Sequence, residues 1–204
     1  PSAYLGDNLK RHLYVNGFVK RGTTDYSFEI DDEGHPFYVV TVYHPSIGYG
    51  GEVVDGIALV DPETGSITEY PFNQAPEWVD RIVPEQFAHD RLTDFGQYSN
   101  GWRNSWLSRK NISRPTQESL DLVWADDGRA YWFTGITSAV KTDQSLTAFV
   151  LMDSRTGETR EYTLDGSDES GVEQAVNAAV SNFTGWKAAD AILYNIYGEM
   201  TWVV

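Results

Sequence analysis

Two stretches of the chain share one order of apolar and polar positions. Residues 56–70 read Gly-Ile-Ala-Leu-Val-Asp-Pro-Glu-Thr-Gly-Ser-Ile-Thr-Glu-Tyr, and residues 148–162 read Ala-Phe-Val-Leu-Met-Asp-Ser-Arg-Thr-Gly-Glu-Thr-Arg-Glu-Tyr. In both, a short apolar run leads into Asp-x-x-Thr-Gly, and a Glu-Tyr pair follows. Short apolar runs that are bounded by turn residues are typical of β-strands. The pattern therefore predicts two β-hairpins and indicates that the chain contains an internal repeat.

Three further segments show helical periodicity, and each is followed by a glycine and an aromatic residue. The pairs Gly17-Phe18, Gly101-Trp102 and Gly185-Trp186 are separated by 84 residues each time. A glycine suits the left-handed residue that closes a helix. We expect Pro84 in the first turn of the second helix and Ser170 as a cap of the third. The periodic apolar positions are Leu5, Leu9 and Leu13; Ala88, Leu92, Phe95 and Tyr98; and Val172, Val176, Ala179 and Phe183.

A second kind of hairpin is predicted after each of these glycines. Runs of β-branched and aromatic residues flank short turns that are rich in Asp, Asn and Gly, which supply the positive φ of a tight turn. The predicted strand pairs are 26–30 with 36–42, 122–124 with 130–133, and 192–196 with 201–204.

The predicted fold class is therefore α+β, as a tandem repeat of a helix plus an antiparallel β-sheet with a period of about 84 residues. We expect a first unit over 1–83, a second over 84–167, and the helix and first hairpin of a partial third unit over 168–204. This last part is either a truncated unit or a capping hairpin. Because the chain begins at Pro1 and stops within the apolar run 200–204, we expect a fragment of a longer protein.

The segment 76–84 joins the first two predicted units. It carries apolar residues between Pro76 and Pro84, which is unlike the composition of a flexible linker. We therefore expect a fixed interface, with Trp78 and Ile82 buried between the units.

Composition limits the partners that the chain can bind. The 204 residues include 15 basic and 30 acidic side chains, a net charge of −15, and no cysteine. This balance argues against nucleic acid and against an anionic membrane surface, and it leaves a basic protein, a cation or a neutral ligand. No apolar run approaches the roughly 20 residues of a membrane span. Without cysteine there are no disulfides or thiolate ligands.

The motifs favour structural roles over catalysis. The sets Asp61/Thr64/Gly65 and Asp153/Thr156/Gly157 are interpreted as turn chemistry, and the acidic run 165–170 as helix capping rather than a metal site. The four histidines lack the spacing of a zinc helix, and no nucleophile elbow, phosphate loop or dinucleotide fingerprint occurs. We therefore predict no catalytic residue, no cofactor and no metal.

The aromatic residues outside the repeat frame are the candidate binding surface. With 7 Trp and 12 Tyr the chain is rich in side chains that suit sugar rings or apolar partner groups. The aromatic residues at positions that recur in the repeat are interpreted as core residues. Loops that are held by rigid hairpins are where binding residues tend to lie. The predicted binding surface consists of Tyr43, His44, Tyr49 and Trp106.

The repeated unit resembles the PepSY-type and related cystatin-like modules of bacterial envelope and secreted proteins. The matching residues are Gly34, Tyr38, Val39, Asp61, Thr64, Gly65 and Tyr70 in the first unit, and Gly128, Trp132, Phe133, Asp153, Thr156, Gly157 and Tyr162 in the second. The insertions 43–55 and 103–119 depart from the pattern of these modules. The resemblance implies an extracytoplasmic binding, inhibitory or regulatory domain without catalysis.

Three function classes follow from the sequence. The first hypothesis is a non-catalytic binding or regulatory module of a larger, extracytoplasmic protein, which binds a protein or a neutral ligand through loop aromatics. The second is a hydrolase that uses paired carboxylates in a groove between the units. The third is a structural or assembly protein that self-associates.

Overall fold

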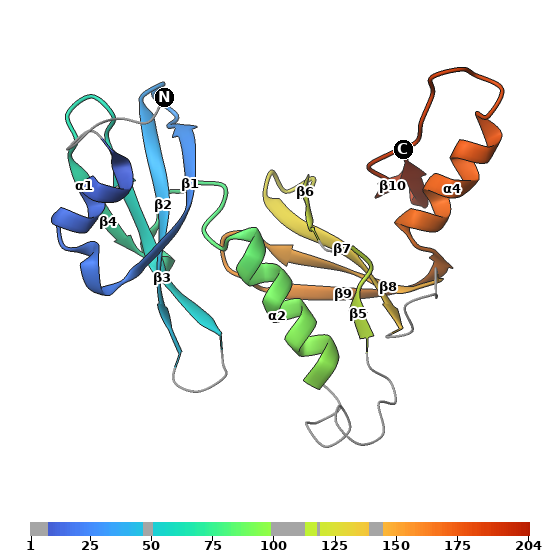
Figure 1. Cartoon of the computed structure of the whole chain (residues 1–204), viewed down its shortest axis with the longest axis horizontal. Helices are drawn as coiled ribbons and strands as arrows, with labels where there is room; N and C mark the ends of the chain where they lie inside the picture. The colour runs from blue at the N-terminus through green and yellow to red at the C-terminus, as the bar shows by residue number, and fades with distance from the viewer. Residues whose placement is uncertain (1–7, 47–50, 99–112, 118, 139–144) are drawn as a thin grey trace. The chain divides into compact units, whose positions relative to one another are not determined.

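The computed structural model describes residues 8–46, 51–98, 113–117, 119–138 and 145–204 (Figure 1). The described part is an α+β protein with three α-helices and antiparallel sheets. The chain divides into two compact units. Unit 1 comprises Pro1–Ala88 together with Asp153–Gly157, and unit 2 comprises His89–Met152 and Glu158–Val204.

Unit 1 begins with a short helix and continues as a four-stranded meander. The elements are α1 (Leu9–Val15), η2 (Phe18–Lys20), β1 (Gly22–Ile30), β2 (Pro36–Pro45), β3 (Glu52–Val60), β4 (Ile67–Pro71) and η3 (Phe72–Gln74). The strands pair antiparallel in chain order, β1-β2-β3-β4. Asn8 caps α1 by accepting the Arg11 amide at 3.1 Å. Gly17 follows the helix at φ +105°, as the sequence predicts for a residue that closes a helix.

Both faces of the unit 1 sheet are covered at its central strands β2 and β3, which explains why 39–42 is apolar at nearly every position. One face packs against α1 and η2 through Leu13 and Phe18, and the opposite face packs against Val79 and Ile82. Successive residues of a strand point to opposite faces, so a strand that is covered on both sides needs apolar residues throughout. The first face carries Val40, Val42, Ala58 and Val60, and the second carries Val39, Ile57 and Leu59.

The segment 75–83 forms the cover of this second face. Ile82 is 1% exposed, and Trp78 is partly buried with its ring 5.6 Å from that of Phe37. Thr41, which is buried in β2, donates its hydroxyl to the Ile82 carbonyl at 3.0 Å. The structure thus places Trp78 and Ile82, which the sequence analysis assigned to an interface, in the core of unit 1.

The turn Asp153–Gly157 holds this cover segment through its backbone. The Arg155 guanidinium donates to the carbonyls of Ala75 at 3.1 Å, Pro76 at 2.9 Å, Glu77 at 3.1 Å and also Val79. A segment without regular structure has carbonyls that need partners when they are withdrawn from water. A charged donor with five N–H groups can satisfy several of these carbonyls at once.

Ser154 completes the contact between the turn and the cover segment. Its carbonyl accepts the amides of Ile82 at 2.9 Å and Val83 at 2.8 Å, and its hydroxyl donates to the Asp80 carbonyl at 2.6 Å. Ser154 itself is fully buried. The turn therefore supplies both donors and acceptors to the backbone of 75–83.

Unit 2 contains most of the second helix, a five-stranded sheet, the third helix and a separate hairpin. The elements are α2 (Glu85–Tyr98), β5 (Ser113–Pro115), β6 (Asp121–Trp124), β7 (Ala130–Ser138), β8 (Ser145–Asp153), β9 (Thr159–Ser167), α4 (Glu169–Ala179), β10 (Ile192–Ile196) and β11 (Glu199–Val203). The sheet order is β5-β7-β8-β9, with β6 also paired to β7, while β10 and β11 pair with each other.

The hairpins and helices predicted from periodicity are present, whereas the predicted cap of α4 is wrong. Ser170 lies inside the helix, and the cap is Asp168, whose carboxylate accepts the Gly171 amide at 2.8 Å. The helix begins earlier than the apolar period indicates because an Asp in the acidic run supplies the capping oxygen. The prediction that Gly185 closes this helix is wrong, because α4 ends at Ala179 with Val180 as its C-terminal cap, and Gly185, with φ +86°, lies five residues further on. Gly101 lies outside the described residues.

We predict that Arg155→Ala lowers the free energy of unfolding by about 2–3 kcal/mol, because the variant loses charge-assisted hydrogen bonds to four backbone carbonyls. Urea denaturation followed by tryptophan fluorescence measures this change. The matched control is Arg160→Ala on β9, where the side chain is 59% exposed and the expected change is under about 0.5 kcal/mol. Equal unfolding midpoints for the two variants would contradict the role given to Arg155.

Candidate functional site

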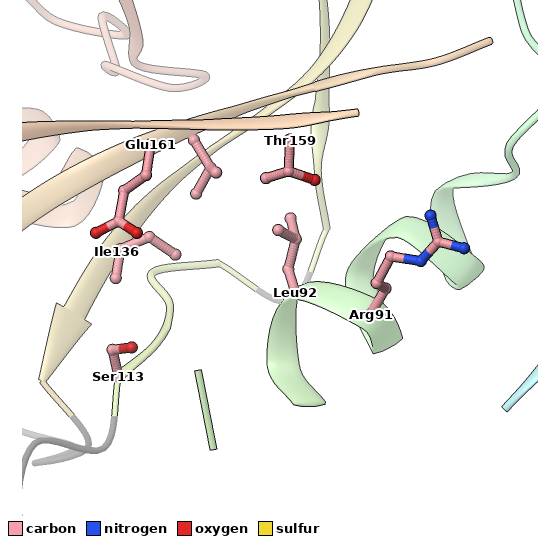
Figure 2. A pocket seen from close by; sticks show the side chains of 7 residues that line it. Arg91, Leu92, Ser113, Ile136, Thr159 and Glu161 are labelled. Carbon is pink, nitrogen blue, oxygen red and sulfur yellow. The ribbon is translucent and has the colours of Figure 1, made fainter. Parts of the chain in front are cut away.

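A small pocket in unit 2 is the candidate functional site. It lies between α2 and the sheet, has a volume of about 220 Å³, and draws residues from five elements (Figure 2). The lining residues are Arg91 and Leu92 of α2, Ser113 of β5, Ile136 of β7, Val150 of β8, and Thr159 and Glu161 of β9.

The apolar part of the pocket results from the spacing of apolar residues along the helix α2 and the strand β8. On α2, Ala88 and Leu92 are buried and four residues apart, so they share one face of the helix. On β8, Val150 is buried along with Leu146 and Ala148, because alternate residues share a face of the sheet. Together with Ile136, these side chains give the pocket an apolar interior.

The polar part of the pocket comes mainly from β9. Glu161 pairs directly with Val150 in the antiparallel register, and Thr159 pairs with Met152. Directly opposed residues have side chains on the same face of a sheet, so Glu161 and Val150 both face the pocket. Figure 2 shows the side chains of Leu92 and Thr159 pointing toward each other.

The pocket carries one group of each charge. Arg91 and Glu161 lie on opposite sides of it in Figure 2, and both residues are exposed. Exposed charges contribute little binding energy in water, whereas an apolar interior favours any apolar group that leaves water to enter it. The arrangement is thus suited to an uncharged, largely apolar group with polar atoms toward Ser113 and Thr159.

A second, more open hollow of about 500 Å³ lies in unit 1 beside the first Asp-x-x-Thr-Gly turn. The His12 side chain reaches this turn, with Nε2 2.7 Å from the Gly65 carbonyl oxygen. Asp61 accepts the amides of Glu63 at 2.7 Å and Thr64 at 3.1 Å, and it accepts the Thr64 hydroxyl at 2.7 Å. These bonds, led by the one from the Thr64 hydroxyl, lower the pKa of Asp61. The interpretation of this motif as turn chemistry is confirmed.

The second turn has the same local chemistry in a buried setting. Asp153 is 3% exposed and accepts the amides of Arg155 at 2.9 Å and Thr156 at 2.8 Å. Gly157 has φ +69°, as Gly65 has φ +73° in the first turn. Among the described residues, no three His, Asp or Glu side chains come together as metal ligands.

The structure describes two of the four residues of the predicted binding surface. Tyr43 is partly buried, with its ring 4.9 Å from that of Phe87 in an edge-to-face contact, and a Cβ at Gly22 would clash with it. His44 is exposed, and its Nδ1 lies 2.7 Å from Asp55 Oδ1. Tyr49 and Trp106 lie outside the described residues, so their place in a binding surface stays a prediction.

One pair of carboxylates was missed in the sequence. Glu29 of β1 and Asp80 interact electrostatically. Burial raises the pKa of Glu29, and the negative charge of Asp80 raises it further. Burial also raises the pKa of Asp80. The Ser27 hydroxyl donates to Glu29 Oε1 at 2.7 Å. Nearby, Arg81 forms an ion pair with Asp25 at 2.8 Å. Glu29 and Asp80 are far apart in the chain, and no spacing rule predicts that they meet.

Glu169 was interpreted as part of a capping run, but its side chain is turned into unit 2. It is 2% exposed, and its Oε1 accepts the Gly135 amide at 3.0 Å. A Cβ at Gly135 would lie 2.5 Å from Leu146 Cδ1, so the glycine makes room for this contact. Burial raises the pKa of Glu169. The neighbouring Asp168, and not Glu169, caps the helix.

Comparison with family models, with curated proteins and with solved structures gives no match to this chain. No helix in the described ranges is long and apolar enough to cross a membrane.

We predict that Glu169→Gln changes the pH dependence of stability. Because the folded-state pKa of Glu169 is raised, its favourable contribution is full below the pKa of the unfolded chain and is lost as pH rises through the folded pKa. Glutamine keeps an acceptor for Gly135 and carries no charge. The variant should match the native chain near pH 4 and be more stable by about 1 kcal/mol at pH 7.5.

Urea denaturation across this pH range measures the difference. The control is Glu63→Gln at an exposed position, where we expect the free energy of unfolding to change by less than about 0.5 kcal/mol. If Glu169→Gln were destabilising to the same extent at both pH values, the Glu169 carboxyl would titrate alike in the folded and the unfolded chain, and the assignment of a raised pKa would be wrong.

Proposed function

We propose that the chain is a non-catalytic binding module whose pocket in unit 2 takes a neutral, mainly apolar group. The observation that carries this proposal is the lining of the pocket, with Leu92, Ile136 and Val150 inside and Ser113 and Thr159 as polar neighbours. An apolar cavity of about 150 Å³ is large enough to bind benzene. A volume of about 220 Å³ therefore accommodates a small ring or one large side chain of a partner protein.

The net charge of −15 supports a neutral or basic ligand over an anionic one. A neutral group is favoured within the pocket itself, because the positive charge of Arg91 and the negative charge of Glu161 cancel and the interior is apolar. A ligand with a single charge loses hydration on entering an apolar interior and regains only part of it from exposed groups.

We further propose that residues 1–83 and 84–167 are tandem copies with a period of about 84 residues, followed by the helix and first hairpin of a third copy over 168–204, similar to PepSY-type and cystatin-like modules. The order of elements supports this proposal, since α1 precedes a meander of β1–β4 and α2 precedes β6–β9. Gly34 and Gly128 both take positive φ in the turn of the first hairpin. Such modules are extracytoplasmic, and we propose the same location for this chain.

The pocket proposal is tested with indole, a neutral aromatic probe. We expect indole to shift the backbone NMR signals of residues that line the pocket, and to bind more tightly than its cationic and anionic analogues tryptamine and indole-3-acetate. Ile136→Phe fills the pocket and should weaken indole binding at least tenfold.

The matched control for this experiment is Leu122→Phe, which adds a ring of the same size at a residue that is 36% exposed on β6. It should leave indole binding unchanged. Undiminished binding to a folded Ile136→Phe variant, or shifts confined to residues away from the pocket, would overturn the proposal.

A further inference from the structure

Four apolar side chains are exposed at matching positions of two hairpins. In β1, Phe28 is 56% and Ile30 is 61% exposed, and in β6, Leu122 is 36% and Trp124 is 56% exposed. In both hairpins they are the last residue of the first strand and the residue two positions before it. Because β6 lies in the middle of the chain, this feature is not tied to either end of the sequence. Exposed apolar side chains that gather on one strand mark a surface that another molecule can cover.

In unit 1 the exposed pair lies beside the open hollow of about 500 Å³. Phe28 pairs with Tyr38 across β1 and β2, and the centres of their rings are 5.4 Å apart in an edge-to-face contact. Ile30 is two residues further along β1, so its side chain is on the same face of the sheet. Tyr38 in turn lines the hollow, together with Leu9 and Val60. The apolar surface therefore runs from β1 into the hollow.

Two acidic turns form the rim of this surface. The turns between β1 and β2 and between β3 and β4 lie at the same end of the meander, because the chain reverses its direction at each turn. Glu33 is 81% exposed and Glu63 lines the hollow, so both carboxylates can reach a ligand. The acidic residues of the two turns are Asp31, Asp32, Glu33, Asp61 and Glu63.

The aspartates at the start of the two turns are held in their charged form. The His35 amide donates to Asp31 Oδ1 at 2.8 Å and lowers the pKa of this carboxyl. The Thr64 hydroxyl, and to a smaller extent the charge of His35, lower the pKa of Asp61. His35 thus interacts with both turns, which shows that they are neighbours. His12 is the second imidazole of the rim, and its Nε2 contacts the backbone of the second turn.

We propose that this surface of unit 1 binds a basic polypeptide segment in which large apolar side chains lie between lysines or arginines. The apolar side chains cover Phe28 and Ile30 and enter the hollow against Tyr38. The basic side chains pair with the carboxylates of the two turns. Apolar contact supplies most of the affinity, whereas opposite charge fixes the orientation and speeds association.

Charge identifies the occupant as a different chain that is basic. The net charge of −15 makes two copies of this chain repel each other on approach, and it attracts a basic partner. The same charge repels nucleic acid and an anionic membrane surface. The surface lies within unit 1, so it is separate from the pocket in unit 2 and does not depend on the function proposed for that pocket.

The probe for this proposal is a synthetic peptide with the run Leu-Trp-Leu between two lysines at each end, added to the whole chain. It should shift the backbone NMR signals of Phe28, Tyr38 and the turn 61–65, and it should bind more weakly as salt is raised. Replacing the lysines with glutamates should weaken binding by about tenfold or more, and so should replacing Leu-Trp-Leu with Ser-Gly-Ser.

The variant that tests the apolar part is Phe28→Lys, which removes the ring and adds a positive charge at the rim. We expect peptide binding to weaken by about tenfold or more. The matched control is Val53→Lys, the same change of charge at a residue that is 41% exposed at the other end of β3. It should weaken binding by less than about threefold. Urea midpoints close to that of the native chain show that both variants are folded.

The acidic rim is tested by the double variant Glu33→Gln/Glu63→Gln, which changes two exposed side chains and leaves the turns in place. It should weaken peptide binding by about fivefold and reduce the dependence of binding on salt. This variant keeps the proposal testable if Phe28→Lys does not fold.

Any of three results would refute the proposal. One is equal binding of the lysine and glutamate peptides. Another is native affinity for the lysine peptide in the double variant or in folded Phe28→Lys. The third is self-association of the native chain in light scattering that Phe28→Lys abolishes, because the occupant of the surface would then be a second copy.

Discussion

The need to satisfy the backbone of the cover segment 75–83 is the constraint on which unit 1 depends. Its apolar side chains close one face of the sheet, so its peptide groups are drawn out of water without a helix or strand to pair them. The turn Asp153–Gly157 resolves this problem through Arg155 and Ser154, and Thr41 adds a bond from β2. Each orphaned polar group would otherwise cost about 1–3 kcal/mol.

The two Asp-x-x-Thr-Gly turns show how one local motif serves two purposes. In both turns an Asp accepts backbone amides and a Gly takes positive φ, so the hairpin is closed in the same way. The two residues between Asp and Thr decide whether the turn also makes contacts with other parts of the chain. Pro62-Glu63 leaves the first turn exposed, whereas Ser154-Arg155 gives the second the donors and acceptors with which it holds 75–83.

The pocket proposed as the binding site in unit 2 combines an apolar interior with one positive and one negative side chain at its rim. Selectivity at such a site would come from the size and polarity of the ligand rather than from its charge.

The sequence by itself determined the α+β class, the helices, the hairpins and the turn chemistry, because these depend on periodicity and on residues close together in the chain. Only the tertiary structure decided where 75–83 lies, since Arg155 reaches a carbonyl 80 positions away. It likewise brought Glu29 beside Asp80, turned Glu169 inward and assembled the pocket from five elements. Such contacts are fixed by packing between distant segments, and local patterns carry no signal for them.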